Sequence, residues 1–67
     1  MLFSNLNLND NEPIYIQIKN HISDMIKKGL IPNNSKLPST RELSQIFNVS
    51  RNSVILAYEE LKSEGVI

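Results

Sequence analysis

The sequence has no cysteine, no long apolar run and no excess of charge of either sign among its 67 residues. Without cysteine it can form neither a disulfide framework nor the usual thiolate zinc sites. Its apolar runs are only a few residues long, so none can span a membrane. Residues 1–12 lack the basic start and apolar centre of a signal peptide. We therefore expect a small cytoplasmic domain, and its 40% apolar and 21% charged residues are typical of a globular chain.

A formal net charge of zero argues against a strongly basic nucleic-acid-binding protein, but the charges are unevenly distributed. Residues 17–56 carry six basic and two acidic side chains, whereas residues 1–16 and 57–67 are each net negative by two. The middle of the chain is therefore the part suited to meet a polyanion. With so few basic groups, we expect non-specific affinity for DNA to be weak and strongly dependent on salt.

No group of residues in the sequence has the pattern of an enzyme active site. There is no nucleophile–base pair, phosphate-binding loop or carboxylate dyad, and His21 stands without a second ligand at metal-binding spacing. We expect neither catalysis nor a bound cofactor or metal in this chain.

The first half of the sequence predicts an N-terminal arm over residues 1–12 and a helix over about 13–28. In the arm, leucines alternate with asparagines, which predicts either a loose arm or an edge strand for another partner. Pro13 suits the first helical position, with Asn11 or Glu12 as cap, and Gly29 suits the end. One apolar stripe follows the helical period and consists of Ile14, Ile18, Ile22, Met25 and Ile26.

Two further helices are predicted after a turn-rich connection. In that connection we expect Asn34 in a turn conformation, and Leu30 and Leu37 packed against the core. Ser39 and Glu42 have the spacing of a capping box and predict a helix over about 40–47. After a turn at residues 48–49, where we expect Val49 to be buried, Ser50 predicts the cap of a third helix over about 51–64. Their inner faces comprise Leu43, Ile46 and Phe47, then Val54, Ala57, Tyr58 and Leu61.

Two capped helices joined by a tight turn indicate a helix-turn-helix, whose second helix enters the DNA major groove. Arg51 can make a bidentate contact with guanine, Asn52 suits adenine or a phosphate, and exposed Ile55 suits a thymine methyl group. The helix starts can bind phosphate through free N–H groups. The candidate DNA-binding residues are Lys36, Ser39, Thr40, Arg41, Ser50, Arg51, Asn52, Ser53 and Ile55. The alternatives without DNA contact are that the arginines are simply solvated, that both serines act only as caps, and that Ile55 belongs to a minor core.

Several blocks of the sequence closely resemble the N-terminal winged helix of the GntR superfamily of bacterial transcription regulators. They are Pro13-Ile-Tyr-Ile-Gln-Ile, Leu37-Pro-Ser-Thr-Arg-Glu-Leu-Ser, Asn48-Val-Ser-Arg-Asn-Ser-Val and the closing Leu61, Glu64 and Gly65. The resemblance covers residues 13–67 and implies a DNA-binding domain with contacts from Arg41, Arg51, Asn52 and Ser53. Position 55 carries isoleucine where several subfamilies have arginine, and Asn33 replaces the usual glycine.

The resemblance also implies a two-stranded wing after Gly65, of which the sequence contains only Val66 and Ile67. We therefore expect an all-α chain, a three-helix winged helix-turn-helix domain lacking most of its β-wing, as a fragment of a longer regulator. Alone, it should bind DNA weakly.

The blocks look most like the MocR subfamily, whose partner domain resembles an aminotransferase holding pyridoxal phosphate, and they are also similar to the YtrA-type branch. By this resemblance the parent protein is a homodimeric regulator, a repressor or an activator, whose effector binds outside this chain. The alternative function is a winged-helix protein-interaction module that does not bind DNA, which the neutral net charge and the exposed Ile55 and Leu56 favour.

Overall fold

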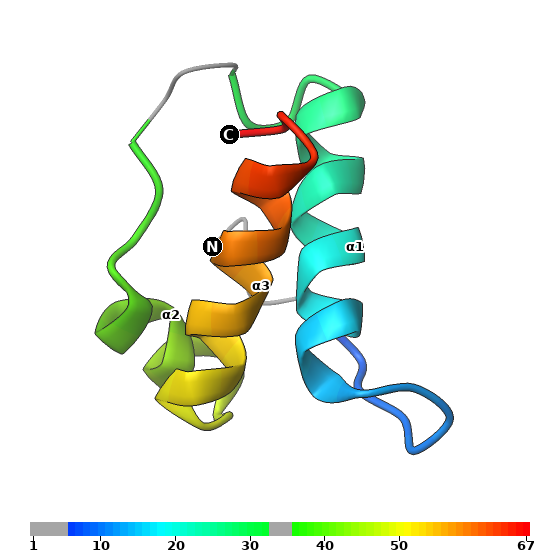
Figure 1. The fold of residues 1–67 in the computed structure, drawn as a ribbon, viewed down its shortest axis with the longest axis vertical. Coiled ribbons are helices and arrows are strands. Elements are labelled where there is room, and N and C mark those ends of the chain that lie inside the picture. Colours follow the sequence, from blue (N-terminus) through cyan, green and yellow to red (C-terminus); the bar gives the residue numbers. More distant parts are fainter. Residues whose placement is uncertain (1–5, 33–35) are drawn as a thin grey trace.

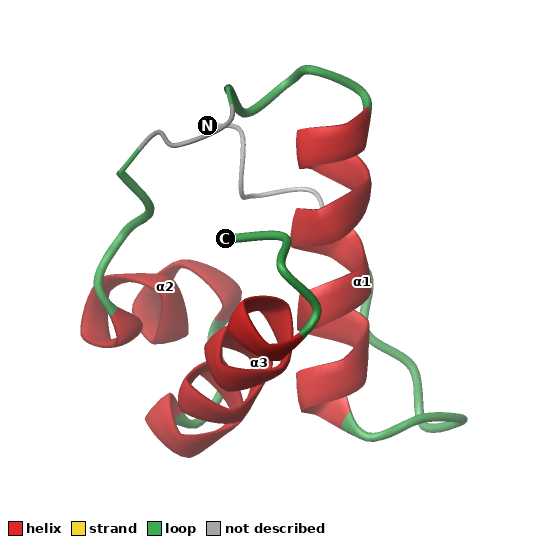
Figure 2. Cartoon of the chain, turned by 45° about the horizontal axis from the view of Figure 1, so that its top comes forward, coloured by secondary structure: helices red, strands yellow, loops and turns green. Residues whose placement is uncertain are grey.

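Three helices form the part of the chain that the structure, a computed structural model, describes, namely residues 6–32 and 36–67. They are α1 (Ile14–Lys27), α2 (Thr40–Phe47) and α3 (Arg51–Ser63). Within these described ranges no residue forms a strand, so the predicted all-helical fold class is confirmed. Figures 1 and 2 show α3 lying between α1 and α2, with the short α2 beside the first half of α3.

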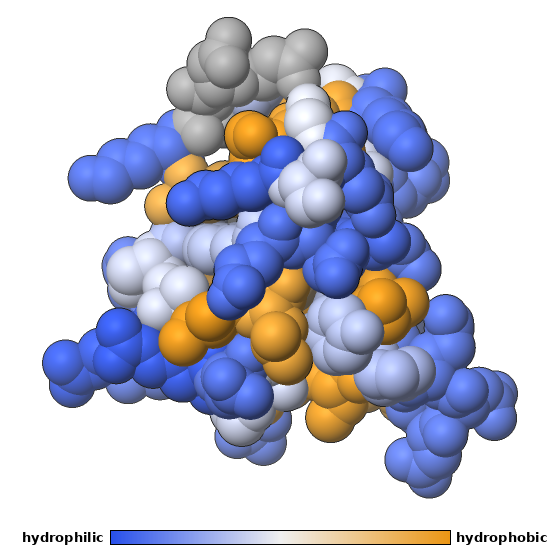
Figure 3. Space-filling view, viewed as in Figure 1, coloured by the Kyte–Doolittle hydropathy of each residue, from blue (hydrophilic) through white to orange (hydrophobic). Residues whose placement is uncertain are grey.

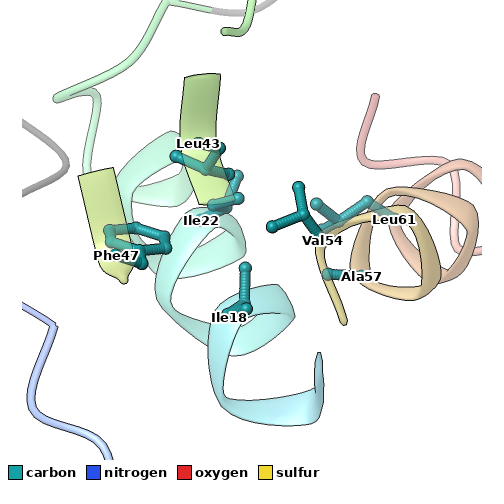
Figure 4. Packing of buried hydrophobic residues seen from close by; sticks show 7 residues of the cluster. All are labelled: Ile18, Ile22, Leu43, Phe47, Val54, Ala57 and Leu61. Carbon is teal, nitrogen blue, oxygen red and sulfur yellow. The ribbon is translucent and has the colours of Figure 1, made fainter. Parts of the chain in front are cut away.

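The core lies where the apolar stripes of the three helices meet. Each stripe follows the three- or four-residue spacing that places side chains on one helix face. Figure 4 shows the side chains gathered between the helices: Ile18 and Ile22 from α1, Leu43 and Phe47 from α2, and Val54, Ala57 and Leu61 from α3. Truncating a buried leucine or isoleucine in such a core costs about 2–5 kcal/mol. The core therefore fixes α2 and α3 relative to each other.

The start of α1 differs from the sequence prediction. Pro13 lies before the helix in an extended conformation, and neither Asn11 nor Glu12 caps it with a side chain. Gln17 instead donates from its side-chain amide to the backbone oxygens of Asn9 (2.9 Å) and Glu12 (2.8 Å). Its oxygen accepts the N–H of Asn9 at 3.0 Å, so the buried amide holds residues 9–12 against the helix.

The described part of the arm, residues 6–12, is therefore neither a strand nor free of the domain. Leu6 packs against the core, whereas Leu8 is exposed. The predicted stripe on α1 was also too long, because Ile14 is exposed and the first fully buried apolar residue of the helix is Ile18.

The connection after α1 reverses at Gly29, which has φ +77°. The N–H groups of Leu30 and Ile31 both bond to the oxygen of Met25. This turn points Ile31 inward, with 4% of its surface exposed, and leaves Leu30 53% exposed, so the prediction that Leu30 packs on the core was wrong. Leu37 is half-buried. The turn predicted at Asn34 and the departure at Asn33 lie outside the described residues.

The end of α3 is closed by Gly65, with φ +75°. The N–H of Val66 bonds to the oxygen of Leu61 at 2.9 Å, and the Val66 side chain packs on the core. Val66 and Ile67 lie beyond the end of α3 at Ser63, and neither forms a strand in the structure. None of the described helices has the length and apolar character needed to cross a membrane.

Candidate nucleic-acid interface

The first residues of α2 and α3 meet at one end of the domain. The guanidinium Nε of Arg51, the first residue of α3, donates to the hydroxyl of Thr40, the first residue of α2, at 3.0 Å. Eleven residues separate the pair in the sequence, so the contact depends on how the two helices pack. Two helix N-termini, each with partly unsatisfied N–H groups, therefore share one surface.

A complete capping box fixes the start of α2. Ser39 Oγ accepts the N–H of Glu42 at 3.0 Å, and the Glu42 carboxylate accepts the N–H of Ser39 at 3.0 Å. These hydrogen bonds, with a smaller contribution from the charge of Lys36, lower the pKa of Glu42. The cap thus holds the Glu42 side chain at the start of α2.

The turn between the helices is set by Asn48. It adopts a left-handed conformation, with φ 55° and ψ 49°, which asparagine tolerates better than most residues that have a Cβ atom. The N–H of Val49 then bonds to the oxygen of Ser44 at 3.0 Å, and its side chain packs half-buried against the core rather than fully buried as predicted. The chain reaches the cap of α3 only three residues after the end of α2, which is the tight turn of a helix-turn-helix.

The start of α3 is organised by two serines. Ser50 Oγ accepts the N–H of Ser53 at 3.2 Å, and the two hydroxyl oxygens lie 2.9 Å apart. Ser53 is half-buried and bonded to Ser50, so it offers less to an incoming ligand than the sequence suggests. Arg51, Asn52 and Ile55 are exposed, with Arg51 at the edge of the buried face and Asn52 and Ile55 farther around the helix.

Some of the nine predicted site residues contact one another in the structure, and others make no such contact. Two direct side-chain pairs form, Thr40 with Arg51 and Ser50 with Ser53. Arg41 and Asn52 are exposed, and within the described residues their side chains make no hydrogen bond or ion pair. Lys36 is exposed on the approach to α2 and lies near enough to act on the charge of Glu42.

Tyr58 is a residue whose part in this site the sequence prediction missed, because its position on α3 suggested simple packing. It is half-buried, and its hydroxyl donates to the backbone oxygen of Pro38 at 2.6 Å. Burial, with a smaller effect of the negative charge of Glu42, raises the pKa of Tyr58 to about 12. A tyrosine on a core stripe commonly finds a partner for its hydroxyl, and this general tendency was the available signal.

The two ends of α3 carry opposite charge. Its first turn bears Arg51, whereas Glu59 and Glu60 follow in the second half with Lys62, and Glu64 lies just beyond the helix. Glu64 is paired with Lys19 of α1 at 2.9 Å, and Glu59 is exposed. Only the first two turns of α3 are therefore suited to approach a polyanion.

His21 of α1 packs against α2. Its ring lies edge-on to Phe47, with 5.9 Å between centroids, and its Nε2 is buried without a hydrogen-bond partner in the described residues. Within the same residues no three metal-binding side chains lie together.

The chain is similar to known bacterial regulators. Residues 14–67 match the model of the family described as bacterial regulatory proteins, gntR family. The HTH-type transcriptional repressor YtrA of Bacillus subtilis is 44% identical over 55 residues, which cover 82% of this chain and 42% of YtrA. Comparison with solved structures found no significant match.

Two further relatives match this chain over a smaller share of their own length. The uncharacterised HTH-type transcriptional regulator YurK of B. subtilis is 44% identical, over 92% of this chain and 26% of its own length. The HTH-type pyridoxine biosynthesis transcriptional regulator PdxR of Corynebacterium glutamicum is 39% identical, over 90% of this chain and 14% of PdxR. The chain thus spans less than half the length of these curated relatives, and these similarities do not separate one subfamily from another.

Proposed function

Because the chain belongs to the gntR family of bacterial regulatory proteins, as the non-enzymatic DNA-binding domain of a helix-turn-helix transcriptional regulator, we propose that it reads a specific operator with the first two turns of α3. The observation that carries this proposal is the orientation of α3. Val54, Ala57 and Leu61 are fully buried on one side, while Arg51, Asn52 and Ile55 are exposed.

In this proposal the exposed residues at the start of α3 face base edges in the major groove. Arg51 donates to a guanine, Asn52 pairs with an adenine or holds a phosphate, and Ile55 contacts a thymine methyl group. Ile55 is 37% exposed although it is apolar, which supports a role outside the core. Exposed Glu59 lies one turn after Ile55. Because its charge repels phosphates, it limits how much of α3 can enter the major groove.

The remaining predicted residues hold the DNA backbone. The capped helix starts at Ser39 and Ser50 offer free N–H groups to phosphate oxygens, as helix N-termini commonly do. Exposed Arg41 and Lys36 add positive charge beside the first of these starts, and the hydroxyl of Ser53 adds a short polar contact. The hydroxyl of Thr40 is bonded to Arg51. Such contacts fix the register of the protein on the duplex without reading sequence.

The whole protein is proposed from its relatives. We propose residues 13–67 as the DNA-reading domain, residues 1–12 as an N-terminal arm, and a full-length homodimer that binds paired half-sites about one helical turn apart. A small-molecule effector would bind outside this chain. The protein would act in the cytoplasm, where bacterial DNA lies. The name of YtrA favours repression.

The identity of the partner domain remains open between two proposals. The MocR-type proposal, with a pyridoxal-phosphate domain, draws on the residue blocks of the sequence and on the match to a pyridoxine biosynthesis regulator. The YtrA-type proposal draws on the match to that shorter repressor. Expression of the full-length protein distinguishes them, because a lysine-bound pyridoxal phosphate gives a characteristic absorbance that borohydride removes.

Selection from a duplex pool tests DNA reading directly. The 67-residue chain is incubated with duplexes that carry a random 20-base-pair segment, at low salt because few basic residues contribute. We expect enrichment of a defined sequence, with affinity that falls steeply as salt rises. Absence of duplex binding at low salt would instead favour a protein-interaction surface formed by the exposed Ile55 and Leu56. Figure 3 shows apolar and hydrophilic side chains intermixed on the face of the molecule that it draws.

A further inference from the structure

Two hydrogen bonds join α3 to the segment at the start of α2. Tyr58, in the third turn of α3, donates to the oxygen of Pro38 at 2.6 Å. Two residues later Thr40 accepts the Nε–H of Arg51, in the first turn of α3, at 3.0 Å. The capping box between Ser39 and Glu42 holds the backbone in between. The backbone next to Thr40 is therefore held by the bond at Pro38 and by the capping box, and the Thr40 hydroxyl accepts one bond from Arg51.

From this geometry we propose that Thr40 is a positioning residue that sets the direction from which the Arg51 guanidinium meets a base. The proposal rests on the DNA-reading function proposed above. An arginine has five N–H donors in a rigid planar fork. When Nε donates to Thr40, the edge formed by Nε and one terminal nitrogen is occupied. Only the end formed by the two terminal nitrogens remains free for a bidentate contact with guanine O6 and N7.

The same contact lowers the conformational cost of binding. A free arginine on the surface samples many rotamers, and immobilising such a side chain at an interface costs about 0.5–1.5 kcal/mol, equivalent to roughly a 2- to 13-fold change in affinity. Because Arg51 is exposed but already tied to half-buried Thr40, part of that ordering precedes DNA binding. A valine at position 40 keeps the shape of threonine and removes the acceptor.

The test measures the affinity of variants at positions 40 and 51 for the duplex that the wild-type chain enriches. A second set of duplexes carries each of the four bases at the position where Arg51→Ala changes the preference. We expect Thr40→Val to weaken binding about 3- to 10-fold and to flatten the preference at that one base position. Thr40→Ser, which keeps the hydroxyl, should restore both. In the Arg51→Ala background, Thr40→Val should change affinity less than about 2-fold, because the two residues act as one unit.

Equal effects of Thr40→Val with and without Arg51 would overturn the proposal and make Thr40 an independent phosphate contact. A retained base preference in Thr40→Val would overturn it as well. If no duplex is enriched, or if Arg51→Ala changes neither affinity nor base preference, the proposed function itself fails. A measurement without DNA tests the hydrogen bond separately from the proposed function. In nitrogen-15 spectra, the Nε–H of Arg51 should exchange slowly with water in the wild type and in Thr40→Ser. It should exchange rapidly in Thr40→Val. Slow exchange in Thr40→Val would refute the hydrogen bond as the cause, and thermal unfolding checks that each variant is folded.

Discussion

The hydroxyl of Tyr58 and the backbone oxygen of Pro38 lie 2.6 Å apart, although twenty residues separate them in the sequence. The bond ties the segment that leads into α2 to the third turn of α3. Because α2 begins at Thr40, two residues after Pro38, this contact stabilises the approach to the proposed DNA-binding surface. It also gives a half-buried tyrosine a partner for its polar end.

Replacing Tyr58 by phenylalanine should lower the free energy of unfolding by about 0.5–1.5 kcal/mol, the usual contribution of one hydrogen bond. Urea denaturation near pH 7 measures it. Tyr15→Phe is the matched control, because Tyr15 also packs half-buried against the core and its hydroxyl makes no hydrogen bond within the described residues. An equal loss in both variants would show that the bond to Pro38 contributes nothing.

The wild type and Tyr58→Phe should differ in their response to alkaline pH. The pKa of Tyr58 is raised to about 12 in the fold from an ordinary value of 10.0. The unfolded chain therefore releases this proton first, so the stability that Tyr58 contributes is fully present below pH 10 and is lost as the pH rises toward 12. Between pH 10 and 12 the wild type should therefore lose more stability than Tyr58→Phe, as urea denaturation at each pH measures.

Substituting Arg51 by alanine should cost about 1–3 kcal/mol of specific binding and relax the preference at one base position. Fluorescence anisotropy with the enriched duplex and its single-base variants measures both effects. Lys62→Ala removes the same charge from the last turn of α3, away from the proposed contact, and serves as the control. A uniform loss across all sequences would make Arg51 a backbone contact.

Arg41 should behave differently because it lies at the start of α2, where we propose a phosphate contact. Arg41→Ala should weaken binding to enriched and scrambled duplexes by the same factor and reduce the salt slope by about 1. Titrations at several salt concentrations give that slope, with Lys27→Ala on the far end of α1 as a charge-matched control. An unchanged slope would place Arg41 off the DNA.

Truncating Ile55 to alanine should reduce the preference for thymine at one position while changing stability by less than about 1 kcal/mol, since the side chain is already 37% exposed. Leu56→Ala is the natural control, because the neighbouring leucine is similarly exposed at 39% but points about 100° away around the helix. If Leu56→Ala alters base preference and Ile55→Ala does not, the orientation assigned to α3 on DNA is wrong.

The turn predicts a residue-specific effect at Asn48, whose φ is 55°. Asn48→Ala should destabilise the fold by about 1 kcal/mol, because a Cβ atom is disfavoured in the left-handed region and alanine lacks the local hydrogen bonding of asparagine. Asn48→Gly should be close to neutral, since glycine adopts this conformation freely. Thermal unfolding compares the two with Gln45→Ala on the exposed face of α2. Equal losses in glycine and alanine variants would show that backbone conformation is not the cause.

The sequence by itself determined the parts of this protein that depend on local chemistry. Capping preferences located the starts of α2 and α3 at Ser39 and Ser50, and the apolar spacing identified Ile18, Leu43 and Val54 as core residues. These signals act over three or four residues, so they can be read without knowledge of the fold. The same reasoning failed at Leu30, because one residue of register after the Gly29 turn decides which side chain faces inward.

Only the tertiary structure decided which distant residues meet. Nothing local to Thr40, Gln17 or Tyr58 specifies Arg51, Asn9 or Pro38 as its partner. Each pairing arises because the buried faces of α1, α2 and α3 fix the helices against one another, and polar groups at their edges then bond to whatever the packing brings within reach. Local sequence thus determines the capped helix starts, whereas the packing of the core determines the orientation of Arg51 between them.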